Sequence, residues 1–553
     1  MLRHRRLVLA SWVVVFVVAG FASSKLNDLL TNRFTLPDTD TERAEQILES
    51  GFDQKSTGSF TLVARTEAGR AEALVPQVAA AARRAAAQLP TGEFVAAQAV
   101  AGDVVTAQIV SELDPADAKG HTDEMRAAVG TIGGAETFLT GQAATERDLD
   151  PVFEEDLQKG ELMVAVPIAL LLLVWTFATL AFLLPFVFAV VTIPTTLGII
   201  WIFANVMELT TYLTNMVTLI GLGIAIDYSL LVVYRFREEL RANGSKDEAI
   251  VRTMATAGRA VVFSGTAVAI GLALLLFMPL PFMRGFGIGG LIIPVVSVAA
   301  AVTLLPVMLS LVGQRLDRVR LLPRRSLARR EDDQRGLWAR LATAIMRRPV
   351  VFAAGAGAAL VLLALPVFAL EVGPGSNYGL PQELESVQGL NILTEAVGAG
   401  ATAPSNVVVD TGRAGGVTDA GITAALARLR EGLEADPQVA RVDFTPESTQ
   451  SIDPTGRYAN VQVVGKSDYG LPESLDFVTR LRGDIIPAAG FPSTAEVYAG
   501  GGPPGGKDFL DLTYGWFPWL VLAVLVATYF LLMRAFRSLL LPLKAIILNL
   551  LSI

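Results

Sequence analysis

The chain has 553 residues, of which 52% are hydrophobic and 18% are charged, with a net charge of -8 and a mean hydropathy of +0.49. This composition excludes a soluble globular protein of this length and indicates a membrane protein. The sequence has no cysteine and only two histidines, His4 and His121, which excludes disulfides and thiolate or imidazole sites for zinc or haem. We therefore expect neither an enzyme nor a bound cofactor.

Nine apolar runs are long enough to cross about 30 Å of hydrocarbon, which takes about 20 helical residues. They lie near residues 7–24, 162–179, 182–204, 211–234, 260–278, 286–312, 350–370, 512–533 and 539–553. The first run could also be a cleaved signal peptide, because "RHRR" precedes it and the small residues of "FASS" end it. A similar basic start and apolar run at 346–366, where no signal peptide can occur, favours a membrane span.

Basic residues set the expected orientation, since they stay on the cytoplasmic side of a membrane. Three arginines near the N-terminus place it inside, and threading nine spans places the segment 314–348, with its eleven arginines, inside as well. The long loops at about 27–160 and 371–511 then lie outside, with 11 basic against 23 acidic residues and 9 against 19. Because this topology and anionic lipid headgroups explain the basic segment, we expect no nucleic-acid partner.

Both outer loops are too long to be linkers and carry the order β-α-β-β-α-β. In the first loop, β-type stretches at 59–64, 93–100, 104–110 and 136–141 surround helical stretches at 69–89 and 116–130. In the second, β-type stretches at 405–410, 439–444, 458–464 and 495–500 surround helices near 417–434 and 472–486. This order predicts a ferredoxin-like α+β domain in each loop.

The chain also repeats itself at an offset of about 344 to 357 residues. "FTLPDTDTERAEQIL" at 34–48 matches "YGLPQELESVQGLNIL" at 378–393, and "TFATLAFLLP" at 176–185 is echoed by "RAFRSLLLP" at 534–542. Each unit has one span, a large outer domain and then a hairpin of spans, which is how many transporters build two pseudo-symmetric halves. The second repeat stops after its third span. We therefore expect either that the second half is incomplete or that the chain is a fragment.

The expected organisation is therefore an α-helical polytopic membrane protein with two extracytoplasmic α+β domains. Its segments are a first span (1–26), an outer domain (27–160), a five-span bundle (161–313), a basic cytoplasmic linker (314–348), a seventh span (349–370), a second outer domain (371–511), and an eighth span with the start of a ninth (512–553).

One carboxylate, Asp227, lies inside the fourth apolar run. It precedes Arg235 by eight residues, or about 12 Å of helix, which is farther than its short side chain can reach toward water. Such a group must face protein or a water-filled cavity, where burial would favour the protonated form and make it a candidate proton gate. The alternative is that Asp227 only fixes helix packing, and Arg235 similarly only caps the inner end of the span.

The neighbours of Asp227 follow from helix geometry. Gly223 lies one turn earlier on the same face and would let a helix or a water approach. Ser264 and Thr266 in the next, oppositely directed span lie at a similar depth, so either hydroxyl could bond the carboxyl group. Tyr228 points about 100° away, yet could meet the same partner helix. Each of these residues is also an ordinary packing residue of membrane helices.

Residues 221–240, "GLGIAIDYSLLVVYRFREEL", followed by "TAGRAVVFSGTAVAIGLALLLFMPLPFMRGFGIGG", resemble the MmpL family of resistance-nodulation-division (RND) transporters. The resemblance covers essentially the whole chain and implies an RND-type pseudo-repeat with porter-type outer domains. It also implies that Asp227, Tyr228 and Ser264 form a proton relay, with Gly223, Thr266 and Arg235 as possible support. The family's second Asp-Tyr pair would fall near position 584, beyond the last residue of this sequence.

Two nucleotide motifs fail on their context. Gly285, Gly287 and Gly290 satisfy G-x-G-x-x-G, but they open a membrane helix and follow no strand. Residues 501–507 nearly match a phosphate-binding loop, but Asp508 replaces the required Ser or Thr and two prolines remove backbone donors. Without a nucleotide, the energy source is expected to be an ion gradient, in which one charge crossing 100 mV is worth about 2.3 kcal/mol.

The resemblance implies a multi-pass protein of the bacterial inner membrane, often actinobacterial, that exports lipids or other hydrophobic molecules driven by protons. Its expected partners are membrane lipids and a hydrophobic substrate, with a homo-oligomer or accessory envelope proteins left open. Competing interpretations are a lipid-sensing receptor of the same superfamily, a protein-export accessory like the SecDF proteins, and an inactive fragment. Nothing in the loops identifies the substrate.

Overall fold

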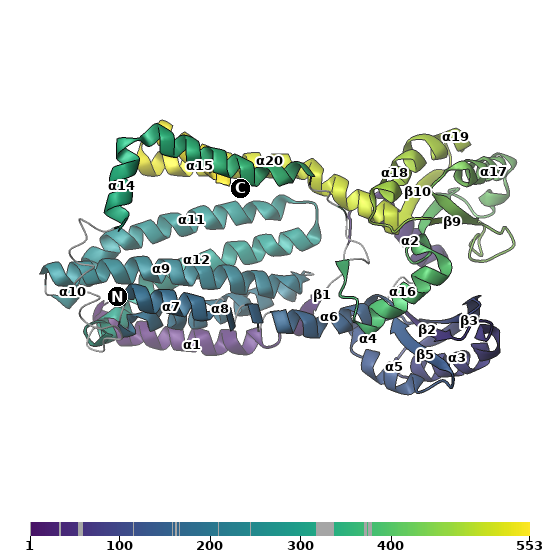
Figure 1. Ribbon diagram of the computed structural model, residues 1–553, viewed down its shortest axis with the longest axis horizontal. Coiled ribbons are helices and arrows are strands. Elements are labelled where there is room, and N and C mark those ends of the chain that lie inside the picture. Colours follow the sequence, from purple (N-terminus) through teal and green to yellow (C-terminus); the bar gives the residue numbers. More distant parts are fainter. Residues whose placement is uncertain are drawn as a thin grey trace. The chain divides into compact units, whose positions relative to one another are not determined.

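The protein is described from a computed structural model, shown in Figure 1. The structure describes residues 2–31, 35–52, 59–113, 115–156, 159–160, 163–164, 166–177, 179–207, 209–243, 245–316, 337–369, 373 and 379–552. It divides into two compact units. The first comprises Met1–Thr31, Gln158–Glu371 and Trp516–Ile553, and the second comprises Asn32–Leu157 and Val372–Gly515.

Apolar helices make up the first unit. Within the described residues, seven helices are long and apolar enough to cross a membrane: Arg5–Ser23, Leu183–Ala204, Tyr212–Ala242, Lys246–Phe277, Pro281–Leu311, Pro349–Val367 and Gly502–Phe536. These seven correspond to seven of the nine predicted spans. The other two predicted spans contain the shorter helices α7 (Val166–Phe177) and α21 (Leu540–Ser552). Of the predicted basic linker, residues 317–336 lie outside the described part of the chain.

Five helices of this unit pack into a bundle: α1 (Arg5–Ser23), α8 (Leu183–Ala204), α9 (Tyr212–Asn243), α11 (Arg259–Ala273) and α12 (Pro281–Leu316). Small residues allow close helix contacts, as expected in a membrane. A Cβ added to Gly198 of α8 would lie 2.6 Å from the backbone of Ala19 in α1. The Trp12 indole donates a hydrogen bond of 3.0 Å to Thr303 and ties α1 to α12.

The second unit contains two four-stranded antiparallel sheets. The first sheet consists of β2 (Phe60–Thr66), β3 (Glu93–Ala101), β4 (Val104–Val110) and β5 (Ala135–Thr140), in the order β3-β4-β2-β5. The second consists of β7 (Ser405–Asp410), β8 (Val439–Asp443), β9 (Tyr458–Gly465) and β10 (Glu496–Gly501), in the order β10-β7-β9-β8. The two sheets therefore share one topology.

Each sheet carries two helices of its own loop. In the first loop these are α3 (Ala71–Ala86), between β2 and β3, and α5 (Thr122–Val129), between β4 and β5. In the second loop they are α17 (Ala420–Ala435) and α18 (Pro472–Arg480) at the matching places. The order along each loop is thus β-α-β-β-α-β, and an apolar core forms between each sheet and its helices.

The two loops also exchange one helix each. Helix α2 (Asp40–Phe52), which belongs to the first loop, packs on the second sheet, where Ala44 and Leu48 contact Val408. Helix α16 (Glu385–Val397), from the second loop, packs on the first sheet beside β5 (Figure 1). The sequence repeat aligns these two segments but gives no sign of the exchange, since local patterns do not say on which sheet a helix packs.

Candidate functional site

The carboxylate of the fourth predicted span lies on an uncovered side of α9. Asp227 is exposed and makes no hydrogen bond or ion pair within the part of the chain that the structure describes. Of the two predicted surroundings, contact with other protein is not found among the described residues, and a water-filled cavity stays a prediction. Gly223, one turn earlier, is exposed as well, and a Cβ added to it would meet nothing within 4 Å.

The other side of α9 explains this placement. Ala225, Tyr228 and Val232 are buried in a core shared with α8 and α12. Gly221 makes the close contact expected of Gly223, because a Cβ added there would lie 2.9 Å from Ile193 and 3.0 Å from Ile293. A helix that turns these residues inward leaves Asp227, about 100° around the axis from Tyr228, on its outer side.

Tyr228 and α11 form the best-packed part of the predicted site. Tyr228 is 6% exposed, and its hydroxyl has no hydrogen-bond partner in the described chain, although Ser264 of α11 lies beside it. The ring packs on Gly265, where an added Cβ would lie 3.1 Å from the Tyr228 hydroxyl oxygen. The structure thus brings Tyr228 and Ser264 together. The small size of Gly265 mainly permits the approach of Val298, since an added Cβ would lie 2.1 Å from the Val298 side chain.

The remaining predicted residues have other partners. The Thr266 hydroxyl donates a hydrogen bond of 2.7 Å to the Val262 carbonyl of its own helix and does not bond Asp227. Arg235 forms ion pairs of 2.6 Å with both Glu238 and Glu239 at the end of α9. These ion pairs favour the interpretation of Arg235 as a residue that caps the end of the span.

Sequence reasoning missed several buried hydroxyl groups in the bundle. Ser229 is fully buried and donates to the Ala225 carbonyl, as Thr192 and Thr196 of α8 do to carbonyls one turn earlier. Ser297 of α12 is fully buried as well, and its hydroxyl has no partner among the described residues. The signal available in the sequence is the run of small hydroxyl residues inside apolar helices.

A second set of polar residues fixes the exchanged helices in the other unit. The first capping cluster consists of Arg126 in α5, Asp148 in α6 (Gln142–Asp156), and Glu385 and Ser386 at the start of α16. Arg126 donates two hydrogen bonds to Asp148, of 2.7 and 2.8 Å, and lies 3.0 Å from Glu385. Asp148 accepts the backbone NH of Ser386 at 2.9 Å. The carboxylate thus caps the first turn of α16, whose NH groups have no partner within the helix.

The second capping cluster repeats this arrangement in the second half. It consists of Arg482, Asp508 in α20 (Gly502–Phe536), and Asp40 and Thr41 at the start of α2. Arg482 donates to Asp508 at 2.9 Å, and Asp508 accepts the Thr41 hydroxyl at 2.6 Å and its backbone NH at 3.3 Å. In each half, an arginine therefore orients an aspartate that caps the second residue of the helix from the other half.

Electrostatics support the first capping cluster. Burial raises the pKa of Asp148, but the hydrogen bonds from Arg126 and from the backbone NH of Ser386 outweigh it and hold the pKa below its ordinary value. The ionised aspartate is therefore the form that this cluster stabilises.

These features define the class. A helical bundle with apolar spans, an acidic residue beside the buried Tyr228 on one of its helices, and a duplicated α+β unit describe a polytopic membrane protein of transporter type. The sequence matches the model of the MMPL family over residues 28–352 and 379–553, so the chain belongs to the MMPL family. The resemblance found in the fourth span is thereby confirmed.

Named relatives show different substrates. The chain is 27% identical to the mycolic acid-containing lipids exporter MmpL11 of Mycolicibacterium smegmatis, over all of this chain and 58% of that protein. It is 28% identical to the trehalose monomycolate exporter MmpL3 of the same species, over 76% of this chain and 43% of that protein. It is 25% identical to the heme uptake protein MmpL11 of Mycobacterium tuberculosis, over all of this chain and 58% of that protein. The chain therefore covers between 43% and 58% of the length of these relatives.

Proposed function

We propose that this protein exports lipids or other amphiphilic molecules from a bacterial inner membrane and that protons drive the export. Membership of the MMPL family supports transport, and two of the three relatives above carry names of lipid exporters. The observation that carries the proton step is a carboxylate about 12 Å inside an apolar helix, next to a buried tyrosine. An ionisable group at that depth is costly in hydrocarbon. Such groups are therefore rare there, and those that occur usually have a function and polar surroundings.

In this proposal Asp227 is the proton acceptor, and Tyr228, with Ser264 beside it, forms the rest of the proton relay. Asp227 and Gly223 form the uncovered side of α9, and protonation of Asp227 would remove the charge that disfavours apolar surroundings there. Another helix or another part of the assembly would then approach this side more closely in the protonated state than in the ionised state. The exposure of Gly223, which leaves room for such an approach, supports this step.

The second unit is proposed to be the substrate-handling part. Its two β-α-β-β-α-β sheets support an interpretation as ferredoxin-like, porter-type domains. The exchanged helices α2 and α16 tie these two domains to each other, so a movement of one domain would be transmitted to the other. We propose that this unit lies outside the cytoplasm, because the arginines near the N-terminus and in the segment 314–348 favour a cytoplasmic position for those two segments.

The test is Asp227→Asn in the protein reconstituted into lipid vesicles, with Asp247→Asn as a matched control. Asp247 lies in the first turn of α10 (Lys246–Thr253), where it is exposed outside the apolar part of α9. With an imposed pH gradient and trehalose monomycolate as the probe, the wild type and the control should move protons and lipid together. Asp227→Asn should lose both fluxes. Equal fluxes in all three proteins would contradict the proposed role of Asp227.

The same assay separates export from the receptor alternative. A lipid-sensing protein would bind the probe lipid without proton flux in the wild type and in both variants. In that outcome, Asp227 would be a packing residue and the proposal of export would fail.

A further inference from the structure

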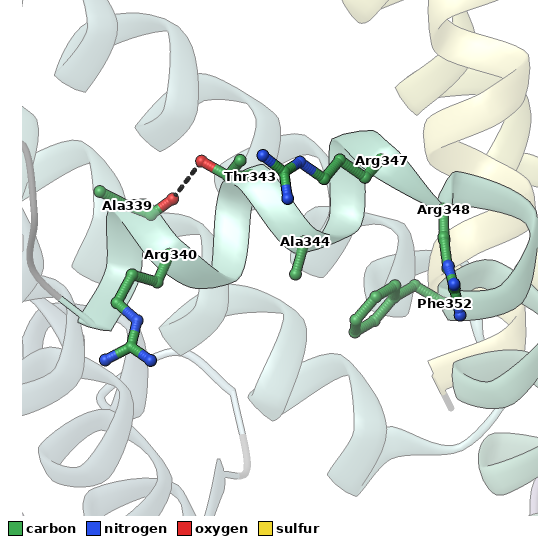
Figure 2. A pocket seen from close by; sticks show the side chains of 7 residues that line it. All are labelled: Ala339, Arg340, Thr343, Ala344, Arg347, Arg348 and Phe352. Atoms are coloured by element: carbon green, nitrogen blue, oxygen red, sulfur yellow. Dashed lines mark hydrogen bonds between the residues drawn. The ribbon is translucent and has the colours of Figure 1, made fainter.

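A hollow lies where helix α14 (Leu337–Arg347) meets the apolar helix α15 (Pro349–Ala364). Its volume is about 570 Å³, and its lining residues are Ala339, Arg340, Thr343, Ala344, Arg347, Arg348 and Phe352. Figure 2 shows Arg340 near one end of α14 and Arg348 at the other, with Ala344 and the Phe352 ring between them. The hollow thus combines three cations with a small apolar floor.

Among the described residues, every charged side chain that lines the hollow is positive. No acidic residue lines it, and within the described part of the chain Arg340, Arg347 and Arg348 form no ion pair or side-chain hydrogen bond. The Thr343 hydroxyl is occupied, because it donates to the Ala339 carbonyl at 2.7 Å. Three guanidinium groups at one hollow match the oxygens of an anion such as a phosphate group.

The opposite face of α14 is apolar and uncovered. Leu341 is 38% exposed and Ile345 is 40% exposed, at the spacing of one helical turn. Met346, the next residue after Ile345, is 80% exposed. A helix with a basic face and an exposed apolar face is typical of one that lies in the interfacial layer of a membrane. Its position directly before the span that starts at Pro349 puts it at that layer.

We propose that α14 lies in the headgroup layer and that the hollow binds the phosphate of an anionic phospholipid. Arg340, Arg347 and Arg348 supply the positive charge around the phosphate, and Phe352 contacts the glycerol and the first methylene groups below it. This lipid is a bound component of the membrane end of α15, separate from any exported substrate. The inference does not depend on proton-driven export or on Asp227.

The occupant is a lipid headgroup rather than free phosphate because of the geometry around the hollow. Phe352 belongs to the apolar span, and the exposed Val350 and Val351 continue the apolar surface away from the arginines. A free anion would use only the arginines, whereas a phospholipid uses the charged rim and this apolar continuation together.

The test compares three forms of the full chain purified in neutral detergent. The first is the wild type, the second is Arg340→Gln with Arg347→Gln and Arg348→Gln, and the third is a control with Arg70→Gln, Arg413→Gln and Arg430→Gln. The control removes the same charge from exposed arginines of the second unit, each of which pairs with a carboxylate. Binding of phosphatidylglycerol, and of phosphatidylcholine with the same acyl chains, is measured by native mass spectrometry.

We expect the hollow variant to lose about 100-fold in phosphatidylglycerol affinity, since each of three arginines contributes roughly fivefold at such a surface. The control should bind like the wild type, and replacement of the three arginines by lysine should restore most of the affinity. Phosphatidylcholine should bind weakly to all forms. Equal phosphatidylglycerol binding by the hollow variant and the control would overturn the proposal. Displacement of the lipid by millimolar inorganic phosphate would also overturn it, in favour of a free-anion site.

Discussion

The two capping clusters perform the same task in the two halves of the second unit, but they are built differently. In the first, Arg126 contacts two carboxylates at 3.0 Å or less, Asp148 and Glu385. In the second, Arg482 holds Asp508 closely, while Asp40 lies 3.5 Å away. The second cluster therefore depends more heavily on one aspartate. Both halves thus cap the exchanged helix with an aspartate held by an arginine. They differ in how much of the contact with the arginine comes from that aspartate and how much from a second carboxylate.

The helix that carries the second capping aspartate also carries an apolar span. Asp508 lies in α20, a continuous helix from Gly502 to Phe536 that is long and apolar enough to cross a membrane. The capping contacts of Asp508 therefore attach the exchanged helix α2 directly to the start of this helix.

The largest effect is expected from removal of Asp508, the aspartate of the second capping cluster. Asp508→Ala should lower the free energy of unfolding of the second unit by about 3 to 5 kcal/mol, because it leaves the largely buried Arg482 without its main partner. Asp148→Ala should cost less, because Glu385 still contacts Arg126. Chemical unfolding of the full chain, followed by hydrogen exchange in α2 and α16, measures both changes.

The control for this pair is Asp511→Ala. Asp511 is 58% exposed and pairs only with Lys507 on the same helix, so its loss should change stability by less than about 0.5 kcal/mol. An Asp148→Ala variant that is destabilised more than Asp508→Ala would show that the second carboxylate near Arg126 does not compensate.

Much of this architecture is predictable from the sequence, and the exceptions have physical reasons. The strands of both outer loops are predictable because alternation of apolar residues is a local property, as in "SNVVVD" at 405–410. Seven of nine spans are predictable because length and hydropathy are also local. The capping clusters are not, because Arg126 and Glu385 are 259 positions apart (385 − 126) and meet only through the helix exchange. The exposure of Asp227 is missed because the sequence gives its depth but not the rotation of α9.

Acidification should lower the stability of both halves of the second unit. The pKa of Asp148 lies below its ordinary value, so its contribution to stability is present above that value and is lost as the pH falls through the lower, folded-state pKa. In the second half, hydrogen bonds from Arg480 lower the pKa of Asp436 despite its burial. We therefore expect hydrogen-exchange protection of both sheets to decrease as the pH falls below about 4.

A variant resolves the contribution of the first cluster to this pH dependence. Asp148→Asn cannot ionise, so α16 should be less protected at neutral pH and should show a flatter dependence on pH, while the second sheet keeps its acid sensitivity. A wild-type slope in α16 of the Asp148→Asn protein would mean that Glu385 or another group controls the acid response.

The smallest effect is expected at the helix residues that the two clusters cap, Thr41 and Ser386, where the clusters differ in the hydrogen bond of the hydroxyl group. The Thr41 hydroxyl donates to Asp508 at 2.6 Å, whereas the buried Ser386 hydroxyl has no hydrogen-bond partner among the described residues. Thr41→Ala should therefore destabilise the second unit by about 1.5 to 3 kcal/mol, the range for a hydrogen bond to a charged group. Ser386→Ala should change stability by only about 0.5 kcal/mol or less, because it removes a hydroxyl that is buried without a partner. Equal losses in the two variants, measured by the same unfolding experiment, would indicate that the Ser386 hydroxyl does find a partner in solution and that the two capping sites are more alike than their geometry suggests.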